Sequence, residues 1–152
     1  MAHTRRISPL VGLFLLALAA CGGGSPTPSA AVAPFMGVWG ATLLTTITCG
    51  SNLPNSANQQ VAFQLETRTG SDVTYTADSG CQFIFQVSGT TATLSNGPVS
   101  CTTNPGGVAT TLKVDSYTLS TTDGHTLTVA VGGTVSQSGT TCTYASNGTG
   151  TR

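Results

Sequence analysis

The sequence predicts an all-β domain of about eight antiparallel strands in chain order, arranged as a small up-and-down barrel with two disulfides. Apolar and polar residues alternate along most of the chain after residue 35, which is the pattern of half-buried strands. Turn-forming residues, glycine above all, separate the alternating segments. Four cysteines fall on the apolar positions of these segments, where buried half-cystines would lie. A β-sandwich is the alternative architecture.

The alternation defines the expected strands. They cover residues 37–49, 59–68, 71–77, 81–88, 91–102, 107–121, 125–137 and 140–147. Eight strands enclose an interior just wide enough to be filled by side chains or to hold one small ligand. Closure of the barrel also removes exposed sheet edges. The inward-facing residues are mainly aromatic residues, Val and Leu, which favours a packed core.

Turn lengths follow from the rule that opposite residues of an antiparallel pair lie on the same face. Three-residue loops that end in Gly satisfy this rule at 68–70, 78–80 and 122–124. The apolar pairs that these loops predict are Leu65 with Val73, Tyr75 with Phe83, and Leu119 with Leu127.

Two-residue loops satisfy the rule at two further turns. They are 89–90, which pairs Val87 with Ala92, and 138–139, which pairs Val135 with Cys142. The alternation slips at Asp115-Ser116, so a β-bulge is expected there. Gly132 and Gly133 lie inside a strand and predict a bend with room for the ring of Tyr144.

Residues 1–20 have the pattern of a secretory signal peptide. Arg5 and Arg6 precede an uncharged apolar run, and the small residues Ala19 and Ala20 come directly before Cys21. A membrane-spanning helix is the alternative, but it needs about 20 apolar residues, and this run is shorter.

The segment Leu18-Ala19-Ala20-Cys21 resembles the lipobox of bacterial lipoprotein precursors. The resemblance implies cleavage between Ala20 and Cys21, a diacylglyceryl thioether on Cys21 and acylation of the new amino group. Two or more acyl chains on one residue give stable membrane anchoring. The non-acidic Gly22 implies the outer membrane in a Gram-negative cell. Ordinary secretory cleavage that leaves Cys21 free is the alternative.

The chain after the signal peptide divides into two parts. Residues 21–34 are the acylated cysteine and a Gly/Ser/Pro/Ala tether, whose composition does not bury a core. Residues 35–152 form the β-domain.

Four cysteines remain after Cys21 is assigned to lipid, an even number in an oxidising compartment. We predict the disulfides Cys49–Cys142, which joins the first strand to the last, and Cys81–Cys101. The second pairing requires a bulge at Asn96-Gly97-Pro98 to bring the two cysteines level. A zinc site is the alternative, but its ligands usually include closely spaced pairs, and these cysteines are far apart.

Gly37-Val38-Trp39, at the start of the first strand, is similar to the G-x-W motif that opens lipocalin and avidin-type β-barrels. The resemblance covers three residues. It implies a barrel whose base is plugged by Trp39 beneath a late arginine. Arg152 is the candidate for that arginine, although it follows the last predicted strand by several residues.

The sequence predicts no enzyme, no metal site and no cofactor. His125 is the one histidine after Cys21, and it lies beside a turn. Asp78 and Asp123 occupy turn positions, where carboxylates accept backbone hydrogen bonds, and no serine lies in a G-x-S-x-G motif. Residues 35–152 carry five acidic and three basic residues without a basic patch, which argues against nucleic-acid binding.

The predicted function is that of a lipid-anchored domain displayed in the cell envelope, with a structural or protein-interaction role. Its partners would be membrane lipid, through acylated Cys21, and an envelope protein. The alternative is lipocalin-like binding of a small apolar ligand, at residues that the sequence does not specify.

Overall fold

The computed structural model describes residues 28–152. The predicted signal peptide, the cleavage site at Ala20 and Cys21, and most of the tether lie outside the described residues. Nine strands and two short 3-10 helices form the described part. Their bounds are η1 Ala33–Phe35, β1 Gly37–Thr48, β2 Asn55–Thr67, β3 Asp72–Thr76, β4 Gln82–Ser88, β5 Thr91–Leu94, β6 Val99–Thr103, η2 Pro105–Gly107, β7 Thr110–Ser120, β8 Thr126–Gln137 and β9 Thr140–Thr151.

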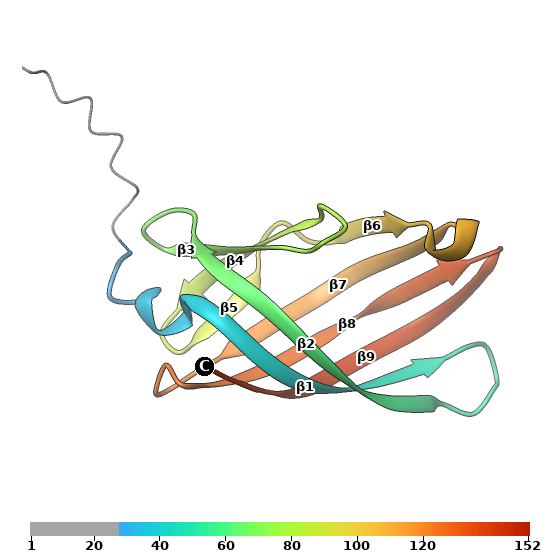
Figure 1. Ribbon diagram of the computed structural model, residues 1–152, viewed down its shortest axis with the longest axis horizontal. Coiled ribbons are helices and arrows are strands. Elements are labelled where there is room, and N and C mark those ends of the chain that lie inside the picture. Colours follow the sequence, from blue (N-terminus) through green and yellow to red (C-terminus); the bar gives the residue numbers. More distant parts are fainter. Residues whose placement is uncertain (1–27) are drawn as a thin grey trace, which may run out of the picture.

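The strands close into an antiparallel barrel (Figure 1). Each strand from β1 to β5 pairs with the next, β7 to β9 do the same, and β1 pairs with β9. Pairing of β5 with β7 completes a ring of eight strands, and β6 is an extra strand on β7. The predicted up-and-down barrel is therefore confirmed.

The strand predicted at 91–102 is broken in two. Its halves, β5 and β6, pair with successive parts of β7, at Thr118–Ser120 and Thr110–Val114. The side chain of Asn96 lies in the break and bonds to the backbone of β4. Its Oδ1 accepts from the Ile84 N–H at 2.9 Å, and its Nδ2 donates to the Gln82 carbonyl at 3.0 Å.

Three predicted turns have the expected register. Tyr75 lies opposite Phe83, Val87 opposite Ala92, and Val135 opposite Cys142. Ser138 and Gly139 both have positive φ, 50° and 82°, as a type I′ turn requires.

The two other predicted registers are wrong by two residues. Thr67 lies opposite Val73, and Leu119 lies opposite Val129. Polar groups in the loops cause both shifts: the Asp72 carbonyl accepts the Arg68 and Thr69 N–H groups, and the Asp123 carboxylate accepts the His125 and Thr126 N–H groups. A shift of two residues leaves every side chain on its predicted face.

The bulge and the room for the Tyr144 ring are confirmed. The β7–β8 register shifts between Val114 and Ser116. A Cβ atom at Gly133 would overlap the Lys113 carbonyl and lie 3.1 Å from Cε1 of Tyr144. Glycine at this position therefore makes room for the tyrosine ring.

The last strand is longer than predicted and runs to Thr151. Its end, with Gly148 and Gly150, has no apolar alternation, but it pairs with both β1 and β8. The Thr42 carbonyl lies where a Cβ atom at Gly148 would be. Because the strand continues, Arg152 follows it directly.

The base of the barrel is closed and densely packed. The Trp39 side chain is fully buried, and its Nε1 donates to the Phe35 carbonyl of η1 at 2.7 Å. The Arg152 guanidinium lies 4.9 Å from the centre of the Trp39 ring, and its Nε donates to the Gly124 carbonyl. Residues of η1 and the β7–β8 loop thus close this end around Trp39 and Arg152.

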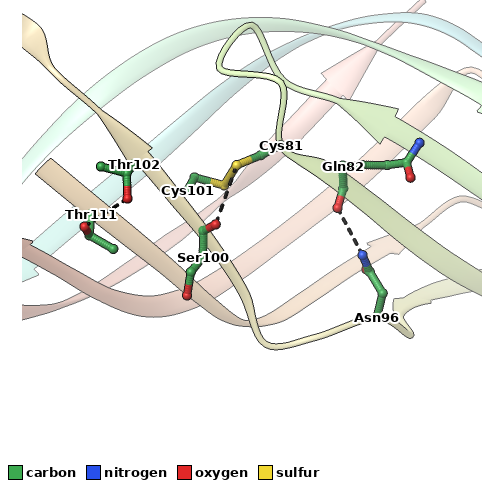
Figure 2. Close-up of a disulfide and its surroundings, with 7 residues drawn as sticks. All are labelled: Cys81, Gln82, Asn96, Ser100, Cys101, Thr102 and Thr111. Atoms are coloured by element: carbon green, nitrogen blue, oxygen red, sulfur yellow. Dashed lines mark hydrogen bonds between the residues drawn. A yellow bond between two sulfur atoms is a disulfide. The ribbon is translucent and has the colours of Figure 1, made fainter.

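Both predicted disulfides form. Cys49–Cys142 joins the end of β1 to β9, with the Cα atoms 4.3 Å apart. Cys81–Cys101 joins the start of β4 to β6, with the Cα atoms 5.8 Å apart (Figure 2). Because all four sulfur atoms are bonded in pairs, these cysteines do not form the alternative zinc site.

Candidate ligand cavity

A cavity of about 440 Å³ occupies the half of the barrel away from Trp39. Along β1, Trp39 lies at the base, Leu43 lines the cavity and Ile47 lies near its mouth. Ser79 and Thr103 at the rim are exposed, so the cavity opens to solvent at the end opposite the closed base. The predicted packed core is therefore found only in the basal half of the barrel.

The change from packed core to cavity follows from side-chain size. The basal half contains the largest buried side chains, which are Trp39, Phe35, Phe85, Leu65, Leu119 and Leu127. Toward the mouth, the lining includes the smaller side chains of Thr45, Ala77 and Ser146.

Aromatic rings form one wall and part of the floor. Tyr75 stacks on Phe83 with ring centres 5.7 Å apart, and Phe83 meets the edge of Tyr117 at the same distance. Tyr117 also packs edge-on against Phe85 at 4.9 Å. Such tilted and edge-to-face contacts stabilise the arrangement beyond simple burial.

Polar atoms form the smaller part of the cavity surface, and some of them bond to one another. The hydroxyls of Thr45 and Ser146 share a hydrogen bond of 2.7 Å, and Thr45 also donates to Gln59 Oε1 at 3.3 Å. The hydroxyl oxygen of Tyr144 is buried and has no hydrogen-bond partner within the described residues.

The tyrosines that line the cavity are neutral phenols at physiological pH. Burial and, secondarily, the charge of Asp115 raise the pKa of Tyr144 to about 12. Burial also raises the pKa of Tyr117, and burial with the Asp78 charge raises the pKa of Tyr75. Among residues 28–152, no charged side chain lines the cavity. The site therefore offers apolar surface and neutral hydroxyl groups.

The histidine and the aspartates that the sequence analysis considered do not converge on one site. His125 and Asp123 are in the β7–β8 loop at the base, where Asp123 caps the loop backbone. Asp78 is exposed in the β3–β4 loop, and Asp72 lies 3.9 Å from Arg68 in the preceding hairpin. Within the described part of the chain, no cluster of His, Cys, Asp and Glu suits a metal ion, and no helix is long and apolar enough to cross a bilayer.

The alternation places Tyr75, Tyr117 and Tyr144 on inward faces, but it does not identify the cavity. The unpaired hydroxyl of Tyr144 is equally invisible in the sequence. The one sequence signal was the glycine pair at 132–133, which predicted space beside this ring.

Comparison with protein-family models finds no match, and comparison with curated proteins also finds none.

Proposed function

We propose that this domain binds a small, mainly apolar molecule in the barrel, while a lipid anchor on Cys21 holds it at a membrane of the cell envelope. The cavity carries the first part of the proposal. A solvent-open cavity of about 440 Å³ is within the range of small-molecule sites, which are typically apolar with a few placed polar groups. Its lining has this composition.

The lipobox-like segment at 18–21 and the tether at 21–34 support the anchor. The chain enters the barrel through η1, where Val32 and Phe35 are buried at the base. The anchor would therefore attach at the end of the barrel opposite the cavity mouth. The mouth would then be the end farther from the attachment point, open to the envelope space.

A second candidate function is docking of an envelope protein. It is favoured by Leu53, which is 91% exposed in the β1–β2 loop, and by exposed Val108 in the β6–β7 loop. Both loops lie at the mouth end of the barrel. Apolar residues at loop tips can contact a partner without any use of the cavity.

Titration with the neutral fluorophore N-phenyl-1-naphthylamine tests ligand binding. We would use protein with Cys21→Ser, so that no attached lipid competes for the probe. Saturable binding at one site per chain is expected. Val135→Trp, which fills the cavity, should reduce probe affinity at least tenfold, whereas Thr128→Trp on the outer face of the same strand should not. Equal binding by both variants would overturn the cavity as the site.

The anchor has its own test. Mass spectrometry of the protein extracted from membranes should show acyl chains on Cys21 and two disulfides. The Cys21→Ser chain should leave the membrane fraction. Recovery of wild-type protein in the soluble fraction without lipid would contradict the anchor but would leave ligand binding intact.

A further inference from the structure

We infer that the free edge of β2 binds an extended polypeptide segment by strand addition, and that every second side chain of this segment is apolar and points into the barrel. The inference goes beyond the small-molecule proposal, but it rests on the same cavity being open. Three observations carry it: an unpaired strand edge, an uncovered inner face of that strand, and the uncharged, mainly apolar lining behind it.

The first observation is that β2 has a partner on only one side along most of its length. From Asn55 to Leu65 it pairs with β1. Its pairing with β3 is limited to Glu66 and Thr67, so no strand within the described residues pairs with the other side of this stretch. Figure 1 shows β2 diverging from β3 and β4 toward the loop that joins it to β1. The outward N–H and C=O groups of this edge are therefore available to an added strand.

The second observation is that the inner face of this stretch is uncovered. Alternate residues of a strand share a face, so Ala57 and Gln59 lie on the same face as buried Phe63. Both are exposed, whereas their partners on β1, Thr45 and Leu43, are buried and line the cavity. The wall of the barrel thus ends at β2 on this side of the mouth, and a strand added beside β2 would extend it.

This edge also lacks the features that usually prevent strand addition. Exposed edges in natural proteins are commonly protected by charged side chains, proline or bulges. Residues 55–65 contain no charged residue and no proline, and their register with β1 is continuous. The edge therefore offers a regular, uncharged ladder to a partner strand.

The third observation defines the chemistry of the partner. Side chains of an added strand alternate between solvent and the interior of the barrel. The interior ones would meet the cavity, whose surface is mainly apolar and which no charged side chain lines among the described residues. A charged residue there would lose hydration without gaining an opposite charge, which is costly. The inward positions of the partner are therefore apolar, and its outward positions can be polar.

A second copy of the chain fits this edge less well than a different polypeptide. Two β2 edges related by a two-fold axis must run antiparallel, so the two barrels would point their bases in opposite directions. The described chain enters the barrel at the base, through η1. Tethers anchored in one membrane favour barrels that point the same way, and this assigns the edge to a separate partner.

A blocked, fluorescently labelled seven-residue peptide of alternating threonine and valine is the probe for this edge. Fluorescence anisotropy measures its binding to the Cys21→Ser protein. Replacing the three valines by serine should weaken binding about tenfold or more, because apolar burial is lost. A lysine in place of the central valine should have a similar effect. The same residues with the valines consecutive control for composition and should also bind more weakly.

Backbone pairing has its own signature. N-methylation of one set of alternate peptide residues should weaken binding about tenfold or more, whereas methylation of the other set should change it less than about threefold, because only one edge of the added strand meets β2. In hydrogen exchange followed by NMR, alternate amides of residues 55–61 should become protected when the peptide is added. Amides of β8, which pairs on both sides, are the control and should not change.

The strand itself offers a matched pair of variants. Ala57→Asp places a carboxylate on the inner face of β2, against the inward valines of the peptide, and should weaken binding about tenfold. Asn58→Asp places the same group on the opposite face and should change affinity by less than about threefold. Circular dichroism verifies that both variants fold.

The outcomes separate this inference from the proposed function. Binding of N-phenyl-1-naphthylamine without binding of the peptide would overturn the inference alone. Peptide binding that leaves the β2 amides unchanged would place the peptide only in the cavity and would also overturn it. Failure of both probes to bind would overturn both proposals. Protection of the β2 edge without peptide, together with twice the chain mass in light scattering, would assign the edge to a second copy and overturn the separate partner.

Discussion

The guanidinium of Arg152 connects the end of β9 to the fully buried ring of Trp39. It lies over Trp39 and donates to Gly124, so it covers the base with both an electrostatic contact and a hydrogen bond. We expect Arg152→Ala to lower the free energy of unfolding by about 1–2 kcal/mol, the range for a partly desolvated cation–π contact. Urea unfolding followed by Trp39 fluorescence and by circular dichroism measures it. Arg68→Ala, which removes an exposed ion pair, should cost about 0–1 kcal/mol.

The Asp123 carboxylate makes the stability of the β7–β8 loop depend on pH. Hydrogen bonds from the Thr126 and His125 N–H groups lower its pKa from 3.8 to about 2. Because the folded pKa lies below the unfolded one, the stabilisation is complete above about pH 4 and is lost as the pH falls toward 2. The midpoint of thermal unfolding of Asp123→Ala should therefore be lower than that of wild type at pH 6 and approach it at pH 2. A constant difference across this range would contradict the assignment.

At the scale of the element, Asn96 and Ser95 connect the break between β5 and β6 to the backbone of β4. Asn96 accepts a hydrogen bond from Ile84 and donates one to Gln82, and Figure 2 shows the second of these bonds. Asn96→Ala should cost about 1–2 kcal/mol for two hydrogen bonds in an exposed setting. Asn96→Asp should keep the bond from Ile84 and lose the one to Gln82. Chemical denaturation measures both, with Asn58→Ala on exposed β2 as a control expected to change stability by less than about 0.5 kcal/mol.

The strands themselves were predictable, because alternation reports which face of a strand is buried. The register of a hairpin was predictable only where the turn backbone alone determines the length of the loop, as at 78–80, 89–90 and 138–139. At the Arg68 and Asp123 hairpins, backbone and side-chain acceptors widen the loop by two residues, and a two-residue shift leaves no trace in the apolar pattern. The end of β9 was missed because Gly148 and Gly150 carry no hydropathy signal.

For the whole molecule, the sequence identified the inward-facing residues but not how much space they leave. Whether a barrel of eight strands is filled depends on which inward residues share a level, and this follows from register between strands far apart in the chain. Leu43 of β1, Phe83 of β4 and Val131 of β8 line the same cavity. The cavity is therefore a property of the closed barrel, and alternation along single strands does not reveal it.

The two disulfides act on different properties of the closed barrel. Cys49–Cys142 spans 93 residues and joins strands that already pair, so it acts mainly by restricting the unfolded chain. Cys81–Cys101 spans 20 residues and joins β4 to β6, which have no ladder between them in the described structure (Figure 2). Cys101 also lines the cavity.

Chain entropy predicts losses of about 4–5 kcal/mol for Cys49→Ala with Cys142→Ala and about 3 kcal/mol for Cys81→Ala with Cys101→Ala. Guanidinium unfolding measures both. Removal of Cys81–Cys101 should weaken N-phenyl-1-naphthylamine binding more than removal of Cys49–Cys142. The reason is that only the shorter bridge holds together a part of the cavity wall where the strands do not pair. If removal of Cys49–Cys142 weakened probe binding more than removal of Cys81–Cys101, the β4–β6 bridge would not be what maintains the cavity wall.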